Sequence, residues 1–459
     1  MSRIDHLLLW LLALVLAPAA AAAQAEAPAV TVYAGARYLD VVAGVWRRGA
    51  IVVRGERIEA LLGEGAPPPA GAAVVDIRGH YAIPGLIDVH QHVTISPSHA
   101  AMERELGRAL HGGVTAIRDM AGDARILAFL ARGTRLGEIA GPDIHFAGVA
   151  AGPSYFAGGA MDGEALGAVP GQVPWMRAVT PETDLADLIV AMRGAGAGGI
   201  KIYANLSPGL VRALAAEARR QGFPIWSHGA IFPTTPLEAV EAGAATLSHV
   251  CMLAYQIQSP PPASYDYADR PPLDEARLLA REPAPEMARL YAAMRARGVV
   301  LDTTLWVYRT IERLRAEMTA AAAPGPPPFL PPIYCSSRLA EHLAGQAARA
   351  GVLLAAGTDS PGLESDPWPG LFEELALLRD SAGIAPIDML RAATVNAARA
   401  LGRTDEMGTI APGRLANIAF LAADPLRPGA DLRTVVLTVK RGRPYWRRDY
   451  RREDAARRP

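Results

Sequence analysis

Alternation of apolar and polar positions marks both ends of the chain. Residues 30–82 contain three such runs, "VTVYAGARYLD", "GAIVVRGERIEALL" and "AAVVDIRGHYAI", separated by Gly- and Pro-rich turns. A similar pattern returns in "GRLANIAFLAADP" and "DLRTVVLTVKRGRPYW". A period of two is typical of half-buried strands. We therefore predict one small composite β-sandwich domain from residues 26–82 and 403–447, followed by a solvated tail at 448–459.

The middle of the chain follows another pattern, in which short apolar runs alternate with longer Ala-, Leu- and Arg-rich stretches. Eight runs qualify as strands: "YAIPGLIDVHQHV", "GVTAIRDM", "DIHFAGVA", "GGIKIYA", "GFPIWSHG", "AATLSHV", "GVVLDTTL" and "GVLLAAGTDS". We expect an α/β fold in which residues 83–402 form a (β/α)₈ TIM-like barrel. An open doubly wound sheet is the alternative, but no Gly-rich dinucleotide fingerprint follows a strand.

The segments between the predicted strands are of two kinds. Some begin with a Ser or Thr before a Pro, as at Thr180-Pro181, Ser207-Pro208 and Thr235-Pro236, which predicts helix N-caps there. Three others, 151–179, 255–285 and 306–331, are long and irregular. Because each follows a strand, each is expected at the C-terminal face of a barrel. They are either lids over a pocket or disordered surface loops.

The N-terminus has the three parts of a secretory signal peptide. Arg3 precedes an apolar run at 7–16, and Ala23-Gln24-Ala25 provides a cleavage pattern. We expect residues 1–25 to be removed, leaving a periplasmic or secreted protein with no stable membrane span. A retained membrane anchor is the alternative. Cys251 and Cys335 are either a disulfide, which an exported protein can form, or two buried thiols.

The charge balance narrows the class of partner. Lys plus Arg and Asp plus Glu each number 46, so the formal net charge is zero. This balance argues against a nucleic-acid-binding surface and favours a small substrate. A homo-oligomer remains possible.

Polar side chains cluster at the ends of five predicted strands. They are His90, His92, Lys201, His228, His249 and Asp359. A closed barrel would bring these strand ends to one mouth. Imidazole and carboxylate ligands together suit Zn²⁺ or a similar divalent ion. The pattern therefore predicts a metal centre.

Lys201 is unusual, because the chain has only one other lysine, Lys440, among its 46 cationic residues. A buried ammonium without a partner is costly. A neutral lysine amine can instead react with CO₂ to give an anionic carbamate, and burial makes that neutral amine accessible. Arginine stays protonated and cannot do this. The alternative is a lysine that extends to solvent at its strand end.

These motifs resemble those of the metal-dependent amidohydrolase superfamily. The resemblance rests on "PGLIDVHQH", "GVTAIRDM", "SH" on two successive strands, "GTDS" and "ATVNAARALGRTDEMGTIAPGRLANIAFLAADP". It covers about residues 30–446, and the motif style is most similar to the prolidase and imidazolonepropionase-like branch. What it implies is a barrel with a split β-sandwich domain and one or two metals, most often zinc, at the mouth.

The resemblance also implies roles for single residues. His90, His92 and Asp359 would bind the more buried ion, and His228 and His249 the second. Lys201, as N6-carboxylysine, would bridge the two ions, which would hold a hydroxide. Asp359 would shuttle the proton. Tyr203, Arg177 and Arg309 are candidate substrate contacts.

We expect an enzyme that hydrolyses a C–N amide or peptide bond, in a Xaa-Pro-like dipeptide or an N-acyl amino acid. A hydrolase of a cyclic amide or lactone is the first alternative. The resemblance also includes mononuclear deaminases, which usually place a Glu a few residues after the histidine of the fifth strand. No carboxylate follows His228 until Glu238, so this alternative is disfavoured. A non-catalytic periplasmic binding protein would lack some of the metal ligands, and none of the six is missing here.

Overall fold

The fold described here is a computed structural model of the chain. The structure describes residues 29–96, 98–159, 161–266, 269–320, 335–360 and 367–450. The predicted signal peptide and most of the predicted tail lie outside these residues. Within the described ranges, no helix is both long enough and apolar enough to cross a membrane.

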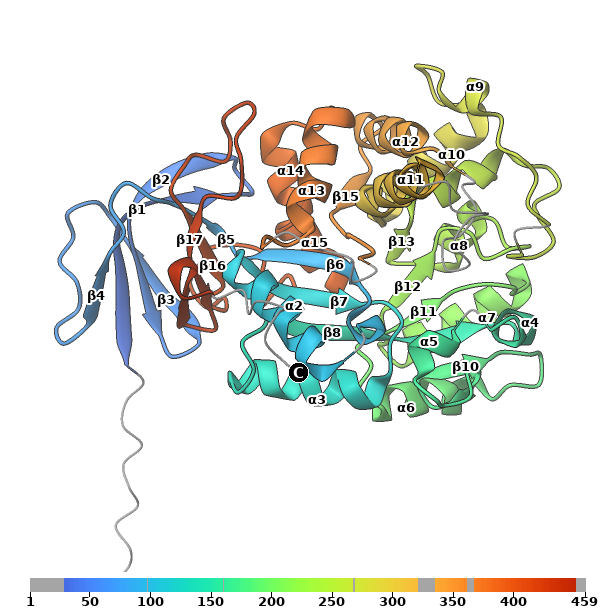
Figure 1. Cartoon of the computed structure of the whole chain (residues 1–459), viewed down its shortest axis with the longest axis horizontal. Helices are drawn as coiled ribbons and strands as arrows, with labels where there is room; N and C mark the ends of the chain where they lie inside the picture. The colour runs from blue at the N-terminus through green and yellow to red at the C-terminus, as the bar shows by residue number, and fades with distance from the viewer. Residues whose placement is uncertain are drawn as a thin grey trace, which may run out of the picture.

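Strands from both ends of the chain form one mixed sheet, which lies beside the barrel in Figure 1. Its strands are β1 (Val30–Asp40), β2 (Val45–Arg54), β3 (Arg57–Leu62), β4 (Ala73–Asp76), β5 (Tyr81–Pro84), β16 (Ile418–Leu421), β17 (Val435–Lys440) and β18 (Arg443–Trp446). Their order is β18-β17-β16-β5-β1-β2-β3, with β4 on β1. The antiparallel pairing of Phe420 with Ala82 joins the two ends. Tyr33, Ile51 and Phe420 lie in its buried core.

Eight parallel strands form the nearly closed barrel. They are β6 (Leu86–Gln91), β7 (Val114–Asp119), β8 (Asp143–Ala151), β11 (Gly199–Ile202), β12 (Ile225–His228), β13 (Thr246–Ser248), β14 (Val300–Asp302) and β15 (Leu353–Ala355). Each corresponds to one of the predicted apolar runs. The predicted fold class is therefore confirmed.

The barrel closes at a seam between its first and last strands. A parallel bridge pairs Gln91 with Ser360, and the Val89 N–H donates to the Ala356 carbonyl. Asp88 reinforces the seam, because its buried carboxylate accepts from the Thr358 N–H at 3.0 Å and from the Thr358 hydroxyl at 2.8 Å.

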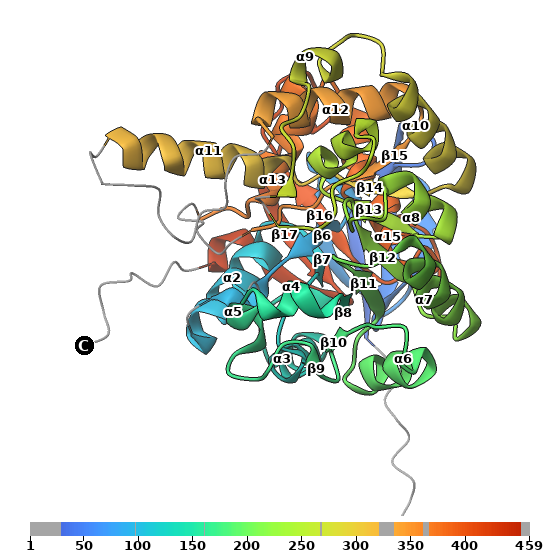
Figure 2. The same cartoon turned by 90° about the vertical axis from the view of Figure 1, so that its right-hand side faces the viewer.

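Helices surround the strands, as the ring of α3, α6, α7, α10 and α12 in Figure 2 shows. The longer helices are α2 (His99–His111), α3 (Ala124–Leu136), α6 (Leu185–Gly194), α7 (Pro208–Arg220), α8 (Pro236–Ala242), α10 (Pro285–Arg297), α11 (Leu305–Ala320), α12 (Ser337–Arg349), α13 (Leu371–Ala376), α14 (Pro386–Ala392) and α15 (Val395–Leu401). Ser207 and Thr235 cap α7 and α8 as predicted. The predicted cap at Thr180 is wrong: Thr180 lies in a turn with Thr183, and Asp184 caps α6 by accepting from two backbone N–H groups.

The insert at 151–179 is more regular than its sequence indicates. It contains α4 (Pro153–Ala157), α5 (Asp162–Ala165), β9 (Gln172–Val173) and β10 (Met176–Ala178). Strand β10 pairs in parallel with β8, so the insert extends the barrel sheet. The second insert contains α9 (Glu275–Leu278), and residues 321–331 of the third lie outside the described part.

Two cross-connections tie distant segments together. Cys251 and Cys335 form a disulfide, which resolves the choice that the sequence left open. At the base of β8, the Lys440 ammonium donates to the carbonyls of Thr134 and Gly141 at 2.6 and 2.8 Å and pairs with Asp143 at 3.2 Å. This second contact joins the terminal sheet to the barrel.

Candidate metal centre and active site

The six predicted ligands all lie at the C-terminal ends of barrel strands. His90 is in β6 and His92 directly follows that strand; Lys201 is in β11, His228 ends β12, His249 follows β13 and Asp359 follows β15. Contacts link the histidines into one group. The ring centres of His90 and His249 are 4.7 Å apart, and those of His249 and His228 are 4.6 Å apart.

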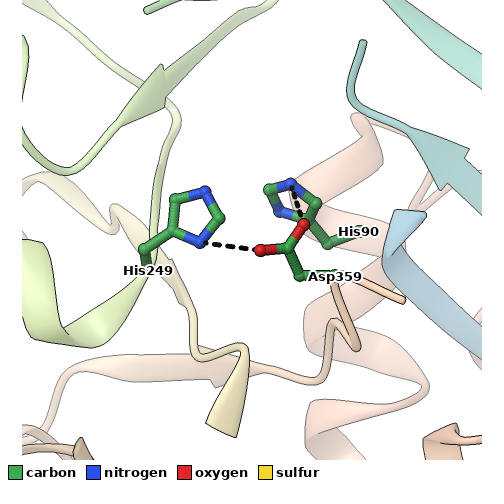
Figure 3. Close-up of side chains that lie close together, drawn as sticks. All are labelled: His90, His249 and Asp359. Carbon is green, nitrogen blue, oxygen red and sulfur yellow. Dashed lines mark ion pairs between the residues drawn. The ribbon is translucent and has the colours of Figure 1, made fainter. Parts of the chain in front are cut away.

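Three of these residues face one another closely enough to hold one ion. Ligand atoms of His90, His249 and Asp359 lie within 4.8 Å of each other. His90 Nε2 is 3.5 Å from one carboxylate oxygen of Asp359, and His249 Nδ1 is 3.5 Å from the other (Figure 3).

The surroundings of His90 test whether a metal fits. Its Nδ1 lies 2.7 Å from the Asp302 carboxylate, which fixes the tautomer and leaves a lone pair on Nε2. That Nε2 is buried and has no hydrogen-bond partner in the described part of the chain. Burial holds the pKa of His90 well below its usual value, so the ring is neutral. A neutral imidazole with an unused lone pair beside a carboxylate fits a divalent ion.

The other two members of this trio, His249 and Asp359, also have the charges that suit a divalent ion. Burial lowers the pKa of His249 to about 3, so this ring is also neutral. Burial alone would raise the pKa of Asp359, but its contacts with the surrounding histidines, including the hydrogen bond from His92, hold that pKa well below its usual value. Asp359 is therefore a carboxylate.

His92 contacts the same carboxylate. Its Nε2 lies 3.1 Å from Asp359 Oδ1, and its Nδ1 lies 3.1 Å from Glu164 Oε1. Although burial lowers the pKa of His92, the charges of Glu164 and Asp359 outweigh it and raise that pKa well above its usual value. Glu164 comes from the first insert and was not predicted from the sequence.

Lys201 lies beside this group without a polar partner. It is 1% exposed. Within the described residues its Nζ makes neither a hydrogen bond nor an ion pair, and it lies 4.5 Å from the centre of the Tyr203 ring. Burial lowers the pKa of Lys201 from 10.5 to about 8. The neutral amine is thus accessible near neutral pH, as the carbamate hypothesis requires.

Aromatic side chains from two inserts line the side of the site near His228. The Tyr265 hydroxyl lies 3.2 Å from His228 Nε2. Tyr155 stacks on Tyr203 with ring centres 4.7 Å apart, and the Tyr203 ring lies 4.6 Å from that of His228. Tyr155 and Tyr265 were not predicted, because the irregular inserts that carry them have no periodicity to indicate which residues face the site.

The backbone around the site adopts conformations that non-glycine residues rarely use. His249, Thr304 and Asp359 have φ values of 70°, 51° and 53°. Local hydrogen bonds hold them: the His249 N–H donates to the Asp302 carbonyl at 2.9 Å, and the Asp359 N–H donates to the His90 carbonyl at 2.9 Å. Such conformations persist where the surrounding structure over-determines them, often at active sites.

Gly357 shows how tightly the site is packed. A Cβ at this position would lie 2.2 Å from Asp302 Oδ1 and 2.7 Å from His90 Cβ. Any side chain would therefore displace the carboxylate that orients His90.

The two arginines predicted as substrate contacts do not lie at the ends of barrel strands, as the predicted ligands do. Arg177 is half-buried in β10. Arg309 is on α11 with half its side chain exposed, and it pairs with Glu341 of α12. Both stay predictions.

Comparison with known proteins identifies the family. The Amidohydrolase family matches residues 81–444. No curated protein matches the sequence.

Solved structures share the fold. A Xaa-Pro dipeptidase with bound methionine in its active site is 18% identical, with a TM-score of 0.70, over 91% of this chain and 100% of that one. A prolidase complexed with N-methylphosphonate-L-proline is 22% identical, with a TM-score of 0.68 over 91% and 99%. An ochratoxinase from A. niger is 20% identical, with a TM-score of 0.67 over 91% and 96%. The chain belongs to the amidohydrolase family and is a metal-dependent hydrolase that acts on carbon–nitrogen bonds.

Proposed function

We propose that the chain is an exported binuclear amidohydrolase that cleaves a Xaa-Pro-like dipeptide or an N-acyl amino acid. The observation that carries the binuclear part is Lys201, which is buried beside the histidines without a polar partner. As a carbamate, this side chain would be an anion with two ligand oxygens, and its burial would be compensated by the ions that it joins.

The predicted ligands divide into two sets. His90, His92 and Asp359 would hold one divalent ion, and His228 and His249 the other, with Lys201 between them. His249 also faces Asp359, so it would lie where the two sets meet. Zn²⁺ suits this mixture of imidazole and carboxylate. Bound there, the ions would polarise the scissile carbonyl and make water a stronger nucleophile at neutral pH.

The protein groups would handle the proton. Asp359 Oδ2 is the carboxylate oxygen that faces His249 and is not the one nearest His92. It would accept the proton that water loses as its oxygen bonds to the carbonyl carbon. Asp359 would then donate this proton to the leaving nitrogen as the C–N bond breaks, releasing a carboxylic acid and an amine.

Two further observations support the choice of substrate and location. The proteins of similar fold include a Xaa-Pro dipeptidase and a prolidase, and the tyrosines beside His228 offer an apolar wall for a small organic substrate. The Cys251–Cys335 disulfide suits an oxidising compartment, in line with the N-terminal signal pattern.

A carbamate measurement combined with a substrate screen tests the proposal. The metal-loaded protein should hydrolyse dipeptides or N-acyl amino acids in a library that also contains cyclic amides and lactones. Protein equilibrated with ¹³C-bicarbonate should give a lysine carbamate NMR signal that Lys201→Ala lacks. An active parent protein without that signal would exclude the bridge, and activity confined to cyclic substrates would exclude the substrate class.

A further inference from the structure

Both histidines of the "HQH" motif have a carboxylate at the ring nitrogen that faces away from the proposed ion. Asp302 lies 2.7 Å from His90 Nδ1, and Glu164 lies 3.1 Å from His92 Nδ1. Asp302 ends a barrel strand, as the ligands do. Glu164 instead lies on the short helix α5, in the insert that follows β8.

Glu164 is built into the site. It is 9% exposed, and its Oε2 is buried without a hydrogen-bond partner among the described residues. A carboxylate removed from water needs a compensating partner, and the His92 ring, whose Nδ1 lies 3.1 Å from Glu164 Oε1, is that partner. The other acceptor near this nitrogen is the Ala121 carbonyl, at 3.4 Å, which is more distant and uncharged.

We propose that Glu164 is a positioning residue for the metal centre: it keeps a proton on His92 Nδ1, so that Nε2, once an ion takes the place of its own proton, presents its lone pair toward Asp359 and the ion. This inference rests on the proposed function, because His92 is assigned there as a ligand. A carboxylate on the outer nitrogen both orients a ligand ring and increases its basicity.

The same contact couples the insert to the ion. Helix α4 of the insert carries Tyr155, which stacks on Tyr203, and the Tyr155 hydroxyl donates to the Met161 sulfur at 3.5 Å. Metal binding at His92 therefore stabilises the position of Glu164 and, through it, the aromatic wall beside the substrate.

Metal affinity of three variants tests the proposal. Glu164→Leu removes the acceptor, and competition with a chelator should show a loss of Zn²⁺ affinity of about 10- to 100-fold. Glu164→Gln keeps a neutral acceptor and should lose only about fivefold. Asp162→Asn removes an exposed carboxylate from the same helix and should bind like the parent. The absorption spectrum of bound Co²⁺ should change in the Leu variant and not in the Asn variant.

Hydrogen exchange gives a readout that does not depend on turnover. Zn²⁺ should slow exchange across 153–165 in the parent protein, and this protection should be lost in Glu164→Leu. Parent-like affinity and protection in the Leu variant would overturn the role of Glu164 and leave the proposed function intact. Should that variant fail to fold, unchanged affinity in Glu164→Gln overturns it instead. A parent protein that binds no divalent ion refutes the proposed function itself.

Discussion

Two buried lysines lie at opposite ends of the barrel, in opposite surroundings. Lys440, at the N-terminal end of β8, donates to two carbonyls and pairs with Asp143. Lys201, at the C-terminal mouth, has the Tyr203 ring beside its ammonium and makes neither a hydrogen bond nor an ion pair with the residues that the structure describes. The chain uses Arg for its other cations, so these two lysines can be compared directly. Lys440, which is hydrogen-bonded, connects the terminal sheet to the barrel. Lys201, which has no polar partner in the described structure, is the lysine with a proposed catalytic role.

Replacing Lys201 should have the largest effect on catalysis. We expect Lys201→Ala to lower kcat/KM by about 10²- to 10³-fold, since transition-state electrostatics of this kind have that size. Its melting temperature without metal should change little, because the amine makes no hydrogen bond in the described structure. Lys201→Arg is the matched control and should be equally inactive, since a guanidinium forms no carbamate. Activity in either variant near that of the parent would contradict the assigned role.

Replacing Lys440 should have the opposite result: a loss of stability with no loss of catalysis. Lys440→Met leaves Asp143 with Arg441, at 2.8 Å, as its ion-pair partner among the described residues. It also removes the donor to the Gly141 carbonyl and leaves the Thr134 carbonyl with the Gly137 N–H at 3.2 Å. We expect the free energy of unfolding to fall by about 3–5 kcal/mol, measured by urea denaturation. The kcat of the folded, metal-loaded protein should stay at the parent value. A large loss of kcat without a loss of stability would show that the two ends are not functionally distinct.

The disulfide at the mouth should contribute somewhat less stability. Cys251 and Cys335 are separated by 84 residues, so their bond restricts a long loop of the unfolded chain. Replacing both with Ser should cost about 2–5 kcal/mol. Urea unfolding with and without reductant measures this cost. Reductant should destabilise the parent and have no effect on the double variant; a parent insensitive to full reduction would contradict the expectation.

The smallest effect, taken per pH unit, should be the pH dependence of stability that Glu374 contributes. Burial raises its pKa from 4.5 to about 8, while its carboxyl contacts the Thr303 hydroxyl at 2.5 Å and the Trp306 N–H at 2.7 Å. The folded state then holds a proton that the unfolded state releases, so the contribution is full below the unfolded pKa and is lost as pH rises through about 8.

Glu374→Gln should remove this term, because an amide mimics the protonated acid. The stability difference between parent and variant should shift against the parent as pH rises, by at most about 1.4 kcal/mol per pH unit. Comparing the two proteins cancels the contributions of Asp88 and Asp302, whose pKa values burial also raises. Parallel stability curves would show that Glu374 is already ionised in the folded state.

The barrel and its histidines were predictable because both depend on local patterns. Short apolar runs defined the strands, and a polar residue at each strand end marked the mouth. Asp302 carried the same signal in "VVLDTTL" and could have been found in this way. Glu164 and Tyr265 could not, since they reach the site through inserts whose course depends on tertiary contacts.

The wrong helix start has a similar cause. Thr180-Pro181 has the composition of a cap, but Asp184 lies closer to the first buried turn and its carboxylate accepts from two N–H groups. The sequence offered two acceptable caps, and packing of α6 chose between them. The disulfide was likewise undetermined, because its two cysteines meet only after the barrel has brought η2 (Val250–Ile257) against α12.

The seam between β6 and the segment after β15 sets the order in which a nascent chain can acquire its site. His90 is made early, yet its partner Asp359 and the seam residue Thr358 come near the end of the barrel. Until they emerge, β6 keeps an unpaired edge with exposed backbone groups. Barrel closure and ligand assembly thus finish together, so a prematurely terminated chain lacks both and cannot retain the ion of a finished enzyme.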